Sequence, residues 1–337
     1  MLPRNYGDPA AEYEVVRHGA GIADRGDRVP VRVYGRDPVK MVQGLITNDI
    51  EGAPEGQGVY AAVLTAKGRM VADVRIFRWP EGELLMDVDA AALDGLLEHL
   101  RKFVPPLFAR FEEMSDRLHV LGVYGPEARD VVSRALGAEI PADLAEEGFV
   151  VHGFEGGDVL VAQTEAVGED GYDLFAPIDR LEALWRALGE AGGRPVGLAT
   201  LDVLRIEAGR PRWGAELTEK TIPLEAGLRE RAISTTKGCY TGQEVIVRIL
   251  HRGHVNWHLR GIALGDAPAP PPETSLFRPG ETKVVGRITS SCTSPLHGQT
   301  IALGYVRREI DPPATLRLGD GDGPEAEIFE LPIPIGE

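Results

Sequence analysis

The order of apolar and polar residues predicts short strands that alternate with amphipathic helices in the first part of the chain. Val31-Arg32-Val33-Tyr34 alternates as a half-buried strand does, and Pro38 suits the first turn of a helix that follows it. Further along, residues 121–124 again predict a strand, and Gly125 and Pro126 precede a predicted helix over 127–132. The chain therefore contains a weak internal repeat.

The second halves of the two repeat units also correspond. Residues 60–64 and 70–77 predict a hairpin, and residues 84–88 predict a further strand. A helical face with i, i+3, i+4, i+7 spacing follows in each unit, formed by Leu93, Leu96, Leu97 and Leu100 in the first and by Leu181, Leu184, Trp185 and Leu188 in the second. We interpret residues 1–253 as two related α+β units, about 1–115 and 116–253, each an antiparallel sheet with helices on one face, between which the chain can interweave.

The pattern changes after residue 253. Strand-like segments at 257–264, 282–289 and 301–306 are separated by turns rich in glycine and proline, such as residues 267–272. Short strands with such turns are typical of a small antiparallel barrel. We therefore expect a separate β domain over residues 254–337.

Composition limits the classes of function. The chain has 337 residues, 43% of them hydrophobic and 26% charged, which suits a globular protein of two or three domains. It has only two cysteines, Cys239 and Cys292, and no secretory signal in its first residues, so we expect a reducing, cytoplasmic setting. A formal charge of -16 and the lack of a long apolar run argue against nucleic acid and membrane partners.

The segment 237–244, Lys-Gly-Cys-Tyr-Thr-Gly-Gln-Glu, concentrates unusual residue types. Thr241 and Glu244 have capping-box spacing, which predicts a helix that begins at Thr241. Cys239 would then lie near the positive end of a helix dipole and close to Lys237, and both features favour the thiolate. The alternative is that Cys239 is a small buried apolar residue, as free cysteines often are.

Basic residues cluster directly after this motif, against the acidic character of the whole chain. They fit either an anion-binding surface or a solvated helix end followed by a strand face. Because no compact set of carboxylates or thiols accompanies the histidines, we predict no metal site here. The residues are Arg248, His251, Arg252, His254, His258 and Arg260.

Three other polar stretches could carry chemistry. Taken alone, residues 47–50 favour a turn, residues 168–173 favour a solvated hairpin turn, and residues 205–210 favour a structural ion pair. Their order along the chain, followed by Ile222-Pro223-Leu224-Glu225-Ala226-Gly227-Leu228, resembles the glycine-cleavage T-protein superfamily. The motif 237–244 is similar to the signature of the YgfZ branch, folate-binding proteins that assist iron-sulfur cluster assembly or repair.

The resemblance implies a ring of three domains around a central folate channel. It places Asp49 near the reactive end of the folate and Glu169 on the pterin, because a carboxylate can accept from adjacent N–H donors. Tyr172 and Arg205 lie in the same resembling stretches and are assigned to folate binding with them. Arg248 and Arg252 would meet the anionic glutamate tail. Cys239, activated by Lys237, would be the redox or cluster-handling group.

The hypothesis is a tetrahydrofolate-binding accessory protein for iron-sulfur enzymes, with such client or assembly proteins as partners. T-proteins lack the cysteine signature, which favours this branch, whereas the presence of Asp49 favours a folate-dependent aminomethyltransferase or demethylase as the alternative. A scaffold that has lost folate binding is the second alternative. Since clusters usually take four protein ligands and only two cysteines are present, we expect no stably bound cluster on this chain.

Overall fold

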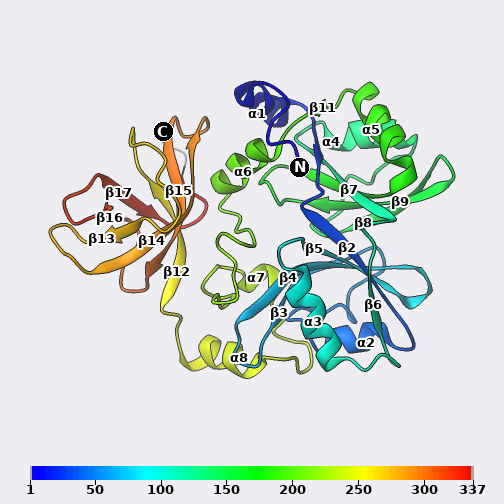
Figure 1. The fold of residues 1–337 in the computed structure, drawn as a ribbon, viewed down its shortest axis with the longest axis horizontal. Coiled ribbons are helices and arrows are strands. Elements are labelled where there is room, and N and C mark those ends of the chain that lie inside the picture. Colours follow the sequence, from blue (N-terminus) through cyan, green and yellow to red (C-terminus); the bar gives the residue numbers. More distant parts are fainter. Residues whose placement is uncertain (1, 335–337) are drawn as a thin grey trace.

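The computed structural model describes residues 2–334, so Met1 and the last three residues of the expected 254–337 domain lie outside it. Two open sheets and one closed barrel form the framework (Figure 1). The barrel lies to one side of the two sheets, and helix α6 (Leu198–Glu207) runs between them. The α+β class with a C-terminal antiparallel barrel is confirmed.

The first sheet has five antiparallel strands. Its strand order is β3-β4-β5-β2-β6, and the hairpin predicted over 60–77 is confirmed as β3 and β4, which pair from Val59↔Ile76 to Leu64↔Met70. The bounds are β2 Arg28–Tyr34, β3 Val59–Leu64, β4 Met70–Arg78, β5 Leu84–Asp89 and β6 Arg110–Glu113.

The second sheet has six strands and takes one of them from the start of the chain. Strand β1 pairs antiparallel with β7 and parallel with β11, so residues 21–24 belong to a sheet whose other strands follow residue 117. The chain is therefore interwoven between the two sheets. In spatial order the strands are β11 Arg194–Pro195, β1 Gly21–Asp24, β7 Leu118–Tyr124, β10 Gly171–Pro177, β9 Gly157–Thr164 and β8 Phe149–Phe154.

Six strands close the C-terminal barrel. All of its neighbouring strands are antiparallel, and Ile262, Ile288 and Val306 belong to its buried core. The strands are, in spatial order, β12 Trp257–Ala263, β15 Gln299–Arg307, β14 Val284–Ser294, β13 Ser275–Phe277, β16 Ala314–Leu318 and β17 Glu325–Phe329.

Helices cover one face of each open sheet, as their apolar spacing predicts. Leu96 and Leu100 of α3 (Leu93–Phe103) pack on the first sheet. Val132 of α4 (Ala128–Leu136) and Leu184 of α5 (Leu181–Glu190) pack on the second. The remaining helices are α1 Pro9–His18, α2 Pro38–Gln43, α7 Arg229–Ala232 and α8 Gln243–Arg252, with short 3-10 turns at Pro80–Gly82 and Ile178–Arg180.

The internal repeat is visible in the structure. Gly35 and Gly125 each follow the predicted strand with a positive φ, 141° and 119°, and a Cβ on either would lie within 2.7 Å of a backbone oxygen. Only glycine suits both positions. Pro38 begins α2 as predicted, whereas α4 begins at Ala128, two residues after Pro126.

The predicted start of α8 at Thr241 is wrong. The helix begins at Gln243, and no side chain caps it, so the capping box does not form. Gly242 has φ 83°, and a Cβ there would lie 2.6 Å from the Thr65 carbonyl oxygen. The amide of Thr241 donates to Gly44 O at 3.1 Å. Tertiary packing of this turn therefore overrides the local capping preference.

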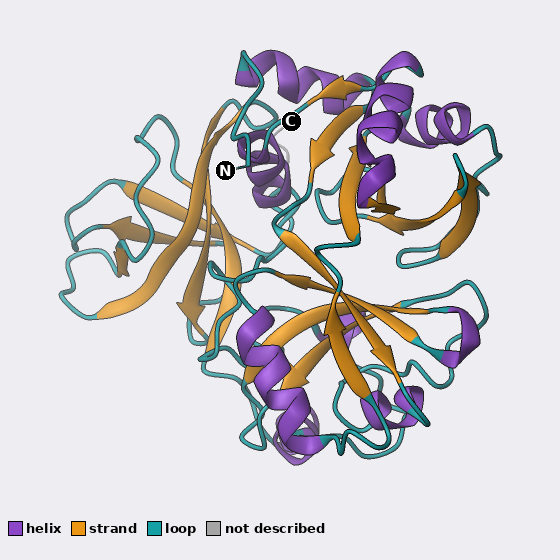
Figure 2. Ribbon diagram, turned by 45° about the vertical axis from the view of Figure 1, so that its right-hand side comes forward, coloured by secondary structure: helices purple, strands orange, loops and turns teal. Residues whose placement is uncertain are grey.

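The inner faces of the two open sheets pack against each other. At one end the contact is aromatic. The ring of Phe77 on β4 packs edge-to-face against Phe149 and Phe175 of the second sheet, with ring centres 5.6 Å apart in both pairs. Elsewhere the contact is ionic. Figure 2 shows the two sheets as separate groups of strands beside the barrel.

Arg75 is the centre of the ionic contact. Its side chain, 6% exposed, donates to Glu147 Oε2 at 2.6 Å, to Asp87 Oδ2 at 3.3 Å and to Asp173 Oδ2. Asp87 belongs to the first sheet and Asp173 to the second. Burial alone would lower the pKa of Arg75, but these carboxylates raise it well above its usual value. One guanidinium therefore joins the two sheets.

We expect Arg75→Met to lower the free energy of unfolding by about 3–5 kcal/mol, because removing one partner of a buried ionic group leaves the others uncompensated. Urea denaturation measures the change. Arg32→Met is the control, because the Arg32 side chain is 33% exposed and pairs with Glu83. This variant should lose less than about 1 kcal/mol of unfolding free energy. Equal losses in the two variants would contradict the assignment.

Candidate functional site

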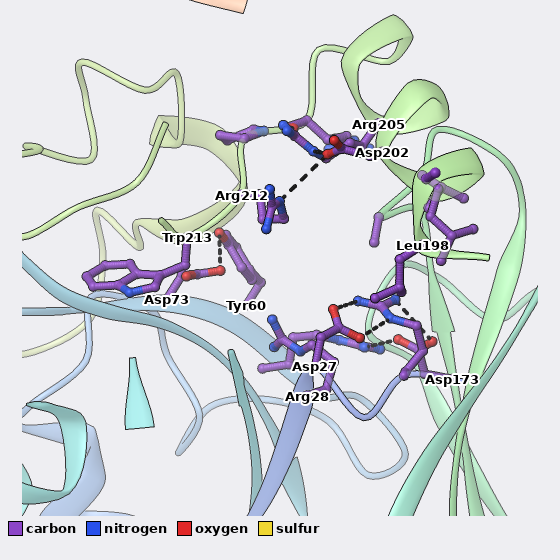
Figure 3. A pocket seen from close by; sticks show the side chains of 18 of the residues that line it. Asp27, Arg28, Tyr60, Asp73, Asp173, Leu198, Asp202, Arg205, Arg212 and Trp213 are labelled. Atoms are coloured by element: carbon purple, nitrogen blue, oxygen red, sulfur yellow. Dashed lines mark hydrogen bonds and ion pairs between the residues drawn. The ribbon is translucent and has the colours of Figure 1, made fainter. Parts of the chain in front are cut away.

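A cavity of about 370 Å³ lies where the two open sheets, α6 and α7 meet. The connection between β1 and β2, strands β3, β4 and β10, and the segment 210–213 all contribute to its wall (Figure 3). The charged and aromatic lining residues are Arg4, Arg25, Asp27, Arg28, Tyr60, Asp73, Arg75, Asp173, Asp202, Arg205, Arg210, Arg212, Trp213 and Arg231.

The lining is cationic although the chain is acidic. Eight arginines and four aspartates line the cavity, whereas the chain as a whole carries a charge of -16. Arg4 and Arg212 are exposed to solvent, while Arg75 is buried. Seven of these arginines form ion pairs with carboxylates of the chain, so the exposed groups of Arg4 and Arg212 are the ones best placed to meet an anionic ligand.

The lining carboxylate of Asp73 has one oxygen that accepts no hydrogen bond within residues 2–334. Tyr60 Oη donates to Asp73 Oδ2 at 3.1 Å, but the buried Oδ1 of Asp73 has no hydrogen-bond partner within residues 2–334. The guanidinium of Arg231 lies 4.1 Å from the centre of the Tyr60 ring. Burial and the Asp73 charge raise the pKa of Tyr60 well above its usual value, so it remains a donor. A buried acceptor without a donor is costly, so Asp73 is a candidate to accept a hydrogen bond from a group bound in the cavity.

Arg205 lies at the α6 side of the cavity. It donates to Asp202 Oδ1 at 2.6 Å, to Glu216 Oε2 at 2.9 Å and to Ser290 Oγ of the barrel at 2.8 Å. Arg205 therefore forms structural ion pairs, as the sequence led us to expect, and it also lines the cavity. These contacts fix Arg205 firmly and connect α6 to the barrel.

Tyr172 and Glu169 lie outside the cavity lining. Because side chains alternate along β10, Asp173 points into the cavity and Tyr172 packs in the core beneath α4 and α5. Glu169 forms an ion pair with Arg17 of α1. The structure thus assigns both residues to internal contacts, and the resemblance did not reveal that Asp173 is the lining residue of this stretch.

Asp49 also lies outside the lining, in the turn after α2. Its Oδ1 accepts from Gln43 Nε2 at 2.8 Å and from the amide of Gly52 at 2.9 Å. These hydrogen bonds, that of Gly52 first, together with the charge of Lys237, lower the pKa of Asp49. The turn interpretation that the residues themselves favour is therefore what the structure shows at this position.

The ammonium group of Lys237 is held by backbone oxygens. It donates to Gln43 O at 2.6 Å, Ile46 O at 2.7 Å and Asn48 O at 2.8 Å. Burial lowers its pKa to about 8, although Asp49 and Glu51 act in the opposite direction. Cys239, two residues further, is exposed and does not line the cavity. Cys292 is buried, which raises its pKa to about 12.

The basic stretch lies on the outer surface. Arg248 and Arg252 are exposed on α8, and neither lines the cavity. Figure 1 places α8 at the edge of the first sheet, away from α6. Within residues 2–334 we find no group of three or more His, Cys, Asp or Glu side chains arranged to hold a metal ion. Across the same range, none of the helices combines the length and apolar character needed to cross a bilayer.

Sequence reasoning missed most of the residues that line the cavity. Asp73 and Arg75 interrupt the apolar strand β4, and Arg28 begins β2. The available signal was the placement of charges within strands that are otherwise apolar, because a charge on an inward position needs a partner or a ligand.

Comparison with known proteins shows the family. The GCVT N-terminal domain matches residues 1–237, and the glycine cleavage T-protein C-terminal barrel domain matches residues 258–328. An aminomethyltransferase of Rubrobacter xylanophilus is 34% identical, covering 99% of this chain and 86% of its own length. An aminomethyltransferase of Bacillus subtilis is 28% identical over 91% of this chain and 85% of its own.

A solved structure shares the fold. The crystal structure of the glycine cleavage system aminomethyltransferase T from Bartonella henselae matches with a TM-score of 0.88, covering 98% of this chain and 91% of its own at 22% identity. The chain belongs to the glycine-cleavage T-protein family, as the family domains and the Rubrobacter relative establish.

The lowered pKa of Asp49 predicts a pH-dependent contribution to stability. A carboxylate whose folded-state pKa is depressed stabilises the fold above its unfolded pKa of about 4, and this contribution disappears as the pH falls through the folded value. We expect Asp49→Asn to lower the unfolding free energy by about 1 kcal/mol at pH 7, and we expect the difference to shrink as the pH falls below the unfolded pKa. Urea denaturation across this range tests it, and a pH-independent difference would contradict the assignment.

Proposed function

We propose that the central cavity binds a reduced folate, tetrahydrofolate or a one-carbon derivative, and that the protein transfers an aminomethyl or related one-carbon group. The Oδ1 of Asp73 carries the proposal, because it is a buried acceptor on a lining residue and has no donor among residues 2–334. The aminomethyltransferase names of the relatives support it.

The lining residues fit a reduced folate. A pterin edge presents adjacent N–H groups that a carboxylate can accept, and Asp73 supplies such an acceptor. The glutamate tail carries carboxylates that guanidinium groups bind, and Arg4 and Arg212 lie exposed at the cavity. When bound, tetrahydrofolate would accept a one-carbon unit at a nitrogen of its reduced pterin ring and the neighbouring anilino nitrogen. Asp73 would accept a hydrogen bond from an N–H group of the folate or from a cationic one-carbon donor bound next to it. Tyr60 would keep the carboxylate oriented.

Asp73→Asn tests this proposal. The amide retains a partner for Tyr60 but loses the charge, so we expect tetrahydrofolate to bind about 10- to 100-fold more weakly. Anaerobic calorimetric titration measures the affinity, and formation of methylenetetrahydrofolate from an aminomethyl donor measures turnover. Asp116→Asn is the control, since its side chain is 75% exposed at the surface.

Asp49→Asn in the same titration compares the two acids. Because Asp49 lies in the turn outside the lining, we expect a smaller loss of affinity than in Asp73→Asn. A larger loss of affinity in Asp49→Asn would indicate that Asp49 contacts the ligand, as the resemblance implied. No binding to any form of the chain would instead favour a scaffold that has lost its ligand.

A second candidate function rests on Cys239. This thiol is exposed, lies outside the cavity and belongs to the motif that resembles the YgfZ signature. We propose that the folate-bound protein supports iron-sulfur enzymes through this cysteine, which would contact a client protein transiently. The exposure of the thiol favours contact with a macromolecule over contact with a ligand in the cavity.

Cys239→Ala separates the two candidates. If the thiol serves client enzymes, the variant should bind tetrahydrofolate with unchanged affinity but fail to restore the activity of iron-sulfur enzymes in a strain that lacks the protein. Cys292→Ala is the matched control, because Cys292 is buried, and its folding should be checked by thermal unfolding. Full restoration by folded Cys239→Ala would exclude the role of the thiol.

A further inference from the structure

We propose that Lys237 is a positioning residue of the central cavity, acting through the turn of residues 47–49 on the side chains of Tyr60 and Arg231. This inference rests on the proposed function, since it concerns the same cavity. It assigns to the motif lysine a role different from activation of the neighbouring thiol.

The first step is the fit of the ammonium group to the turn. An ammonium has three hydrogens, and three carbonyl oxygens, those of Gln43, Ile46 and Asn48, accept from Lys237 Nζ at 2.6–2.8 Å. The Tyr240 ring closes another side, with its centre 5.3 Å from Nζ. The carboxylates of Asp49 and Glu51 are the charged groups that act on the ammonium. Lys237 therefore fixes the backbone between the end of α2 and Asn48.

The second step connects this turn to the cavity. Asn48 Nδ2 donates to the carbonyl oxygens of Tyr60 at 2.9 Å and Arg231 at 3.2 Å. Thr47, fully buried beside it, donates through Oγ1 to Ala232 O at 2.6 Å and accepts from the amide of Ala62 at 2.9 Å. The turn thus bridges β3 and α7, which carry Tyr60 and Arg231.

The third step is the effect on the ligand side. Tyr60 and Arg231 both line the cavity, and the guanidinium lies 4.1 Å from the centre of the ring. Tyr60 also donates to Asp73, the carboxylate with the free acceptor. When the turn shifts, these three side chains move relative to one another. Small displacements of groups that contact a ligand reduce its affinity, because hydrogen bonds depend steeply on geometry.

The test is a double-mutant cycle in tetrahydrofolate titrations of the full chain, kept anaerobic. Lys237→Met and Asn48→Ala should each weaken binding about tenfold, and the double variant should be about as weak as either single one, because both act on one turn. Lys40→Met is the matched control, since Lys40 is exposed on α2, and it should bind like the unmodified chain. Unchanged affinity in folded Lys237→Met, or fully additive losses, would overturn the proposal.

A second measurement separates positioning from thiol activation. The rate at which iodoacetamide alkylates Cys239 at neutral pH should be the same in Lys237→Met as in the unmodified chain. Markedly slower alkylation, together with unchanged folate affinity, would assign the ammonium to the thiol and overturn the proposal. If Lys237→Met does not fold, Lys237→Gln, which retains two N–H donors, takes its place in both experiments.

Hydrogen exchange keeps the inference testable if the unmodified chain binds no tetrahydrofolate, a result that would refute the proposed function alone. Peptides that contain residues 47–49, 60–62 and 231–234 should then exchange faster in Lys237→Met than in the unmodified chain. Peptides from the barrel should be unaffected. Unchanged exchange in the first set would show that Lys237 does not position these walls.

Discussion

The arrangement of the two open sheets depends on the buried ionic contacts of the Arg75 guanidinium. It draws carboxylates from both sheets to one point, Asp87 from the first and Asp173 from the second. A charge in this position is tolerated only because several partners accept from it at once. Arg75 and Asp173 also line the cavity. The ionic contact that joins the sheets therefore also contributes to the polarity of the cavity.

The cavity combines features that the proposed folate ligand would need at its two ends. Asp73 offers a buried acceptor, while Arg4 and Arg212 are exposed cations. The barrel contributes indirectly, since Ser290 holds Arg205 in place from outside the lining. Each of the three structural units thus acts on one site.

The motif around Lys237 and Cys239 has two separate surfaces. The lysine side chain turns inward to the backbone of residues 43–48, and the cysteine remains exposed. The lysine also fixes the turn that contains Asn48, which donates to the backbone of Tyr60, and the Tyr60 side chain donates to Asp73 in the cavity wall. A motif that looks like a single reactive unit in sequence is therefore divided in space between support for the cavity and exposure of a thiol.

The sequence by itself determined the secondary structure and the class of fold, because apolar periodicity records which face of each element is buried. It also showed the repeat and the barrel. Tertiary structure alone decided the site. Tyr60 and Asp73 lie on the β3–β4 hairpin of the first sheet, whereas Asp173 lies on β10 of the second, and the two sides of the cavity meet only when the sheets pack face to face. The start of α8 was likewise decided by the close approach of Gly242 to Thr65 O, a contact that local capping preferences do not contain.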